Sequence, residues 1–477
     1  MAATPPAMDT FPTALELAAL IRSGVLTPLE ALEECVARIE RLNPALRAVV
    51  WRDDDASRAD ADAIGRRIAA KETVGPFAGV PTLVKDLTMA AGQPATFGSA
   101  GAPSGVSGED ELVIAALRRA GFVLCGRSNT PEFGPLPVTE NTRYGITRNP
   151  WDTSRSPGGS SGGSAAAVSS GMVPVAHAND GGGSIRIPAS CCGLVGLKPS
   201  RWRVPSVTPG WFGMSVEGVL CHTVADAAGI LDCISRPDPL VWEQAPAPER
   251  PFASEVGADP GSLRVALLTT SGLGLAVDAA CRHAVEHTGR LLDSLGHRVD
   301  VLDDDVLDPS LVVPFLHVVN ASYGAFDGID WARVEPHNAA GHAAGLALDA
   351  LTVVSSLNQL RRATPPTVAR WGREFDVLVT PTMAIEPPRA GEVLAAAHAT
   401  PAMPPLTVLA MVAFTVLYNV TGQPAVSLPL SRADSGLPVG VQLVGGPWGE
   451  AALVRLAAQI EEAAPWRDRH PSVAALA

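Results

Sequence analysis

The sequence predicts an α/β fold: a single large domain, residues 1–477, in which helices cover both faces of a mixed central sheet. Short apolar runs alternate with helical stretches between Gly75 and Gly218. The apolar runs are Thr82–Val84, Phe122–Cys125 and Val173–Ala176, and the helical stretches are Glu111–Ala120 and Ser164–Ser170. This alternation is typical of strands covered by helices. No long polar linker divides the sequence, which favours one domain over two.

Near the start of the chain, the segment 13–46 is expected to form two helices. Thr27–Glu30 supplies an N-cap, a first-turn proline and a capping-box glutamate for the second of them. After the alternating region, the proline-rich stretch Pro237–Pro260 is expected to be a linker or a surface excursion. The sequence then predicts a strand–helix–strand unit made of Leu263–Thr270, Val277–Leu295 and Arg298–Leu302.

The last third of the chain is expected to turn helical and then return to the sheet. Residues 307–362 are largely helical and weakly patterned. Three buried strands and a closing amphipathic helix follow, at Asp376–Thr380, Ala425–Pro429, Gly440–Val444 and Glu450–Glu462. The longest apolar stretch, Leu406–Tyr418, is too short to span a bilayer. We expect it to be a buried helix or a strand-like core segment.

The composition limits the kinds of partner that the chain can bind and indicates its cellular compartment. The formal charge of −13, the pI near 5.3 and the lack of any run of lysine or arginine argue against nucleic acid and membrane as partners. The seven cysteines are an odd number without CxxC or Cys/His ligand spacing, so we expect reduced, mostly buried thiols. No basic region followed by an apolar stretch marks a signal peptide. A soluble, cytoplasmic protein is expected.

Lysine is scarce in this chain. Only three of the 36 basic residues are lysine, namely Lys71, Lys85 and Lys198. Arginine therefore serves as the generic positive charge, and a retained lysine points to something arginine cannot do, namely losing its proton near neutral pH. For Lys85 the simple structural alternative is an ion pair with the adjacent Asp86.

The densest signal is the glycine- and serine-rich segment Ser156–Ser164, followed by Asn179–Arg186. A phosphate-binding loop would need a lysine directly after the glycines, where this chain has alanines. Gly158–Gly162 formally matches the G-x-S-x-G elbow of α/β-hydrolases, which would make Ser160 an esterase nucleophile, but no HGGG-type motif precedes it. A flexible linker fits poorly because an apolar helix follows. Local composition alone favours neither a turn nor a catalytic site.

A further interpretation, a Ser–Ser–Lys site, rests on spacing. Ser160 lies 75 residues after Lys85, and Ser184 lies 24 residues after Ser160. Together with the sequence motifs around these residues, this pattern resembles the amidase signature family. The matching motifs are Gly79–Asp86, Ser156–Ser164, Asp180–Pro188, Cys192–Pro199, Phe414–Pro429 and Gly436–Gln442. They spread over nearly the whole chain, and the core of the signature lies at about 75–218.

The resemblance implies the chemistry of the site. Ser184 is the expected nucleophile and Ser160 the expected proton relay, held in a cis peptide with Gly159. Lys85 is the expected base, and burial among apolar neighbours would favour the neutral amine that this role needs. Arginine could not take its place.

The loop before the nucleophile is expected to form the oxyanion hole. Glycine tolerates unusual dihedral angles, so the backbone N–H groups of Gly181, Gly182, Gly183 and the following Ser184 can turn onto one point. Asp180 and Arg186 are expected to brace this loop by hydrogen bonds. At Gly181 many family members carry threonine, and we expect the missing side chain to loosen or widen the pocket floor.

Other residues are given supporting roles. His177 is expected to be structural, and Lys198 to anchor a turn. Gly134, Pro135 and Leu136 are expected to form one pocket wall, and the helical region at about 305–400 to contribute to the substrate pocket. We expect no cofactor and no metal, because no cluster with ligand spacing and no dinucleotide fingerprint is present.

Within the family, the chain resembles hydrolases of nylon-oligomer cyclic dimers. This resemblance rests on the motifs Thr147–Trp151, His177–Asp180, Ile185–Ser190 and Asn419–Gln423. Related amidases cleave aryl acylamides, and some bacterial relatives hydrolyse carbamates, so the resemblance implies a small neutral amide or carbamate as substrate. A glutamine-type amidase subunit of an amidotransferase is the alternative, although the acidic charge counts against tRNA. The oligomeric state, with a homodimer as one option, is left open.

Overall fold

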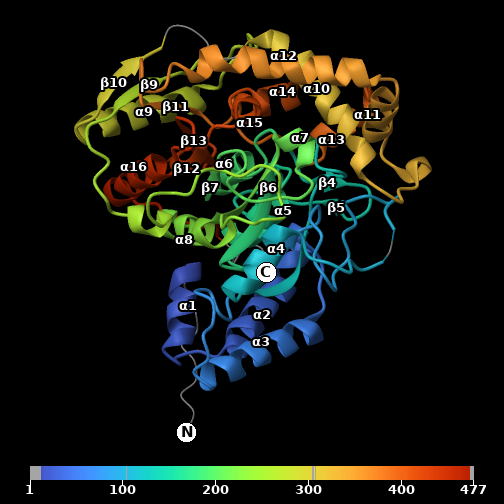
Figure 1. Ribbon diagram of the computed structural model, residues 1–477, viewed down its shortest axis with the longest axis vertical. Helices are drawn as coiled ribbons and strands as arrows, with labels where there is room; N and C mark the ends of the chain where they lie inside the picture. The colour runs from blue at the N-terminus through green and yellow to red at the C-terminus, as the bar shows by residue number, and fades with distance from the viewer. Residues whose placement is uncertain (1–11, 104, 303–305, 307, 473–477) are drawn as a thin grey trace.

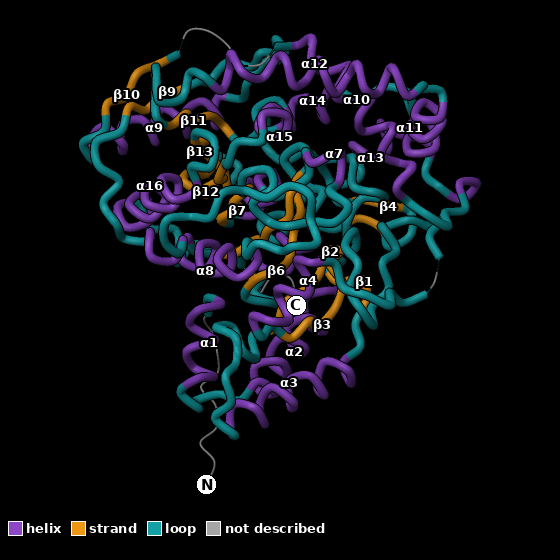
Figure 2. The backbone as a smooth tube through the Cα atoms, viewed as in Figure 1, coloured by secondary structure: helices purple, strands orange, loops and turns teal. Residues whose placement is uncertain are grey.

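The computed structural model describes residues 12–103, 105–302, 306 and 308–472. An 11-stranded mixed sheet runs through the middle of this part of the chain, as the orange strands of Figure 2 show. In spatial order its strands are β1 (Val49–Trp51), β3 (Val123–Ser128), β2 (Pro81–Lys85), β6 (Val175–Asp180), β8 (Val216–Cys221), β7 (Val195–Lys198), β12 (Ala425–Arg432), β13 (Pro438–Gly445), β11 (Val377–Pro381), β9 (Arg264–Leu267) and β10 (Arg298–Val301). A separate hairpin consists of β4 (Glu140–Asn141) and β5 (Gly145–Ile146).

Helices cover both faces of the sheet (Figure 1). Consecutive strand residues point to opposite faces, so Val84 joins one apolar core and Leu83 the other. The first core contains residues of α1 (Ala14–Arg22), α4 (Leu112–Ala120), α8 (Val224–Ile234), α9 (Ala279–Ser294) and α16 (Glu450–Ala463). The second contains residues of α2 (Pro28–Leu46), α5 (Gly162–Ser169), α6 (Arg186–Cys192), α13 (Glu392–Ala399) and α14 (Leu406–Val412). A third core lies under α10 (Val312–Ala321), α12 (Ala350–Val368) and α15 (Val416–Thr421).

The predicted fold class is therefore confirmed. The two expected N-terminal helices are α1 and α2, and each opens on a capping box, Thr13 with Glu16 and Thr27 with Glu30. Such caps satisfy N–H groups that have no acceptor within the helix. The strand–helix–strand unit is also present, as β9, α9 and β10, and the two strands pair in parallel.

Sequence reasoning missed several elements, among them β7, β8 and α3 (Asp54–Ala69). The strands β7 and β8 contain glycine, glutamate and lysine, which are depleted in strands. A Cβ added at Gly196 in β7 would lie 2.6 Å from Cβ of Ala189 in α6, so close packing requires a glycine there. The helix α3 buries only Ser57 and Ala61, and therefore lacks the apolar stripe by which a helix is recognised.

Two expected segments need refinement. The apolar stretch Leu406–Tyr418 is divided into α14 and α15 by a turn that contains Thr415. The region 305–400 holds α10, α11 (Pro336–Leu346), α12 and α13, but β11 within it belongs to the central sheet. The expected surface excursion at Pro237–Pro260 is confirmed, since it holds only one short 3₁₀ turn, Phe252–Glu255, and Trp242 in it is 97% exposed.

Two further findings concern the cysteines and the apolar helices. All seven cysteines are free and buried, as their odd number and spacing predicted. Among the described residues, no single helix has the length and apolar character needed to cross a membrane. In the described part of the chain, one pair of helices, α11 and α12, reaches that length and composition when taken together, across a bend of 103°.

Candidate active site

Lys85 ends strand β2 in the interior of the molecule, where its side chain is fully buried. Its Nζ lies 2.7 Å from Ser160 Oγ and 2.6 Å from Asn179 Oδ1. Burial lowers the pKa of this amine to about 7, against the opposing effect of the carboxylates of Glu217 and Asp180. A substantial fraction of Lys85 is therefore neutral near pH 7, as a proton acceptor must be.

The ion pair between Lys85 and Asp86 does not form. Asp86 Oδ1 lies 3.5 Å from Arg127 Nε, and the carboxylate accepts hydrogen bonds from the backbone N–H groups of Thr96 and Gly98. Asp86 is thus committed to a separate buried network. The side chain of Lys85 is left to its two polar partners, a hydroxyl and an amide oxygen.

Ser160 lies in a loop directly before α5 and follows a cis peptide bond between Gly159 and Ser160, as expected. An α/β-hydrolase elbow would place the serine between a strand and a helix. Here irregular chain, Ser156–Gly159, precedes it, and its hydroxyl contacts a lysine amine. The structural context required by the esterase alternative is therefore missing at Ser160.

Asp180, at the end of β6, braces the loop that leads to Ser184. Its carboxylate forms a buried ion pair with Arg186, with Nη2–Oδ1 at 2.9 Å and Nε–Oδ2 at 2.9 Å. It also accepts the backbone N–H groups of Gly183 and Ile185. Burial alone would raise the pKa of Asp180, but Arg186 holds it well below its usual range, so the carboxylate stays ionised. The expected bracing role of both residues agrees with these contacts.

The guanidinium of Arg186 links this loop to the C-terminal part of the sheet. It donates to the carbonyl of Thr415, to Gln442 Oε1 at 2.7 Å and to Asn419 Oδ1 at 2.6 Å. Asn419 in turn donates to the carbonyl and the carboxylate of Asp180. These partners come from α15, the turn before it and β13. The contacts explain why motifs that are far apart in the sequence belong to one site.

The expected oxyanion hole requires one correction. The N–H of Gly183 donates to Asp180 Oδ1 at 2.7 Å and is not available to a substrate. The N–H groups of Gly181, Gly182 and Ser184 have no hydrogen-bond acceptor among the described residues. Of the expected donors, only Gly183 is thus removed, and Gly181, Gly182 and Ser184 are the ones that the loop leaves open. A Cβ at Gly183 would lie 2.4 Å from Thr415 Oγ1, so glycine is needed there for close approach.

The expectation that Gly181 widens the pocket floor is wrong. A Cβ added at Gly181 would lie 2.7 Å from the indole ring of Trp211, so this ring already fills the space that a side chain would take. Trp211 adopts a left-handed backbone conformation (φ 52°) in α7 (Gly210–Gly213) and packs edge-on against Phe315 of α10, with ring centroids 5.7 Å apart. The indole ring of Trp211 thus fills the space left by the missing side chain at Gly181.

The three expected wall residues differ in their placement. A Cβ at Gly134 would lie 3.5 Å from Ser160 Oγ and 2.7 Å from Leu87, so this backbone passes directly beside Ser160. Leu136 belongs instead to the second apolar core, and Pro135 is half-buried. Of the three, Gly134 is therefore the one placed against the Ser160 hydroxyl.

His177 has the structural role that was expected. Its Nδ1 accepts the backbone N–H of Lys85 at 3.3 Å, and its Nε2 lies 2.8 Å from Glu217 Oε2. Sequence reasoning assigned no role to Asn179, which sits two residues later on the same strand and contacts Lys85 Nζ. Its position directly before Asp180 is the only local signal that could have identified it. Lys198 also behaves as expected, since its Nζ donates to the Pro199 carbonyl.

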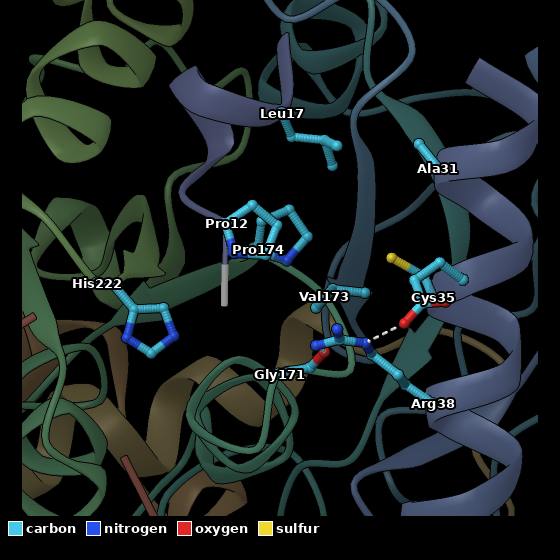
Figure 3. Close-up of a pocket in the computed structure, with 10 residues that line it drawn as sticks. Pro12, Leu17, Ala31, Cys35, Arg38, Gly171, Val173, Pro174 and His222 are labelled. Carbon is cyan, nitrogen blue, oxygen red and sulfur yellow. Dashed lines mark hydrogen bonds and ion pairs between the residues drawn. The ribbon is translucent and has the colours of Figure 1, made fainter. Parts of the chain in front are cut away.

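A small cavity between the N-terminal helices and the sheet is separate from this site (Figure 3). Leu17, Ala31, Cys35, Val173 and His222 are among the residues that line it, and its volume is about 20 Å³. Such a volume holds about one water molecule. The cavity is therefore too small for an organic substrate.

Comparison with known proteins agrees with this geometry. The family model described as Amidase matches residues 30–454. A 6-aminohexanoate-cyclic-dimer hydrolase from Pseudomonas sp. (strain NK87) is 36% identical, and the match covers 98% of this chain and 97% of that protein.

Solved structures give the same result. The structure of a 6-aminohexanoate cyclic dimer hydrolase complexed with substrate matches with a TM-score of 0.90 and 34% identity, over 98% of this chain and 99% of that one. A bacterial aryl acylamidase of the amidase signature family matches with a TM-score of 0.85 and 29% identity, over 96% and 97% of the two chains. The chain therefore belongs to the amidase signature family of amide hydrolases.

Proposed function

We propose that this chain hydrolyses neutral amide bonds through an acyl-enzyme on Ser184, with Ser160 and Lys85 as the proton relay. The observation that carries the proposal is the 2.7 Å contact between Ser160 Oγ and the buried amine of Lys85. The lowered pKa of that amine supports its role as a base. The braced loop before Ser184, with its open N–H groups, supports the role of Ser184 as nucleophile.

The proposed mechanism has two halves. Ser184 Oγ attacks the amide carbonyl while its proton passes to Ser160, whose own proton passes to Lys85 Nζ. The N–H groups of Gly181, Gly182 and Ser184 stabilise the oxyanion, and the departing amine takes the proton back along the same path. Water then attacks the acyl ester, again giving its proton to the relay, and Ser184 leaves with a proton to release the acid.

The dependence on a neutral amine sets the pH profile. Since the pKa of Lys85 is about 7, kcat/KM for a neutral amide should rise about tenfold per pH unit below this value and level off above it. Protonated Lys85 at low pH cannot accept the proton of Ser160. The measurement is kcat/KM against pH for a non-ionising substrate, with unfolding monitored at each pH. A flat profile through pH 7 would contradict the assignment.

The surroundings of the loop favour neutral substrates. The Cβ position of Gly182 lies 3.9 Å from both Trp211 and Val416, and the Cβ position of Gly134, near Ser160, lies 2.7 Å from Leu87. Asp180 and Arg186, the ion pair that braces the loop, neutralise each other, and Lys85 must be neutral to act as the base. A substrate carboxylate would therefore lose its hydration without gaining a partner. Nylon-type cyclic amides and aryl acylamides, the substrates that the names of the relatives indicate, are both neutral.

The substrate proposal predicts an order of reactivity. Neutral secondary amides, anilides and small aryl carbamates should have a higher kcat/KM than glutamine. Carbamates are included because attack on their carbonyl gives the same oxyanion, so urethanase and esterase side activities are expected. The comparison is kcat/KM for a neutral anilide, a small carbamate, a nylon-type cyclic amide and glutamine, side by side. If glutamine is preferred tenfold or more, about 1.4 kcal/mol in transition-state binding, an amidotransferase-like role is the better hypothesis.

We also propose that the enzyme works in the cytoplasm on small molecules. Its free, buried cysteines suit a reducing compartment. Its net charge of −13 does not suit a nucleic-acid partner. A homodimer remains a proposal that sedimentation of the purified protein would test.

A further inference from the structure

Three potential metal ligands from two helices meet at one end of the molecule. Glu335 directly precedes α11, His337 lies in the first turn of α11, and His398 lies near the end of α13, which neighbours α11 (Figure 1). Glu335 Oε2 is 3.5 Å from His398 Nε2 and 3.9 Å from His337 Nδ1. One donor atom from each of the three residues lies within 4.8 Å of the other two.

The donor atoms of this cluster lack partners. Glu335 Oε2, both ring nitrogens of His337 and Nε2 of His398 are buried and form no hydrogen bond among the described residues. The side chain of Glu335 is only 1% exposed and that of His337 only 9%. Buried polar atoms in proteins are nearly always paired. Several unpaired atoms directed at one point therefore indicate that a ligand completes the site.

We propose that Glu335, His337 and His398 bind a divalent transition-metal ion such as Zn²⁺. Imidazole nitrogen and carboxylate oxygen are zinc ligands, and bonds of about 2.0–2.2 Å place the ligand atoms of a tetrahedral ion about 3.3–3.6 Å apart. The separations of 3.5 and 3.9 Å approach that spacing, so small side-chain shifts bring the ligands to the ion. His398, whose side chain is 28% exposed, lies on the solvent side, where the ion enters and water supplies the remaining ligand.

The hydrogen bonds around Glu335 orient it for this role. Its Oε1 accepts the backbone N–H of Thr142 at 2.6 Å, which leaves Oε2 directed at the imidazoles. The backbone N–H of Glu335 donates to Glu132 Oε2 at 2.8 Å, and Glu132 lies two residues before Gly134. A bound ion would therefore tie α11 and α13 to the segment that passes beside Ser160. This is a stabilising role for the substrate-pocket region, separate from the acyl transfer.

The proposed site departs from the expectation that the chain binds no metal. That expectation rested on spacing along the sequence, and His398 follows His337 by 61 residues. Only the contact between α11 and α13 brings them together. Sequence rules for metal sites detect ligands that recur within a turn or a short loop.

Two variants test the site, and a third is the matched control. His398→Ala removes the most exposed ligand and is the least disruptive to folding. Glu335→Gln keeps an oxygen to accept the Thr142 N–H but removes the anionic ligand. His283 and His287, both exposed and one turn apart on α9, form a surface pair that can bind metal adventitiously. The control is the double variant His283→Ala/His287→Ala.

The full-length protein is dialysed against a chelator, desalted and titrated with Zn²⁺ by calorimetry, and its Tm is measured with and without Zn²⁺. Co²⁺ replaces Zn²⁺ in a second titration, because tetrahedral Co²⁺ absorbs strongly in the visible. We expect saturable binding of one ion, a higher Tm with metal, and affinity at least about tenfold weaker in both cluster variants but unchanged in the control. The proposal is overturned if the wild type binds no ion, if the cluster variants bind as tightly as wild type, or if only the control loses binding.

Discussion

Ser184→Ala should abolish amide hydrolysis, with a fall in kcat on the order of 10⁶-fold, the effect of removing the nucleophile of a serine hydrolase. Ser184 is the hydroxyl that follows the loop braced by Asp180, and its side chain is buried, so alanine removes one oxygen without opening the fold. The variant should also resist labelling by a fluorophosphonate probe. The measurements are kcat on a neutral anilide and the mass of the protein after exposure to the probe.

Ser160→Ala is the comparison that separates the two serines. If Ser184 is the nucleophile, Ser160→Ala loses most of its turnover because the path to Lys85 is broken, but any covalent label it acquires lies on Ser184. If Ser160 were the nucleophile of an esterase elbow, the label would follow Ser160 in both variants. Robust labelling of the Ser184→Ala protein at Ser160 would therefore replace the proposed mechanism with the elbow hypothesis.

The fold was predictable where its causes are local. The capping box of Thr27 and Glu30 predicted the start of α2, and apolar runs on either side of a helical stretch predicted the βαβ unit β9–α9–β10. The order of strands was not predictable, because β12 joins β7 in the middle of the sheet across more than two hundred residues. That pairing depends on packing against α6, where Gly196 meets Ala189, and no local pattern encodes such a contact.

The candidate site divides in the same way. Lys85, Ser160 and Ser184 could be predicted as site residues from the sequence motifs around them and from their spacing. The structure does bring Lys85 and Ser160 into contact. The sequence could not show that the Gly183 N–H donates to Asp180. It also could not show that the ring of Trp211 lies next to Gly181. Both depend on where distant or backbone atoms lie. Glycine in a sequence shows that a side chain is absent, but not what occupies the space.

Lys85→Arg should lose nearly as much activity as Lys85→Ala, on the order of 10⁴-fold or more in kcat. Arginine keeps the positive charge, but its guanidinium stays protonated at any pH at which the protein is folded, so it cannot accept the proton of Ser160. Burial already brings the pKa of the lysine amine to about 7, a shift that a guanidinium cannot match. The measurements are kcat for both variants at pH 7 and pH 9, with circular dichroism to establish the folded fraction.

Lys71→Arg is the matched control, because Lys71 is exposed and outside the site, so this exchange should leave kcat unchanged. The pH dependence adds a readout that a purely structural lysine would not affect. In the wild type the rate should rise through pH 7, whereas the residual activity of Lys85→Ala should show no such step, since the proton acceptor on the reaction path has been removed. If Lys85→Arg keeps most of the wild-type rate, or if Lys85→Ala keeps the step, then Lys85 positions Ser160 and Asn179 without carrying the proton, and another group must be the base.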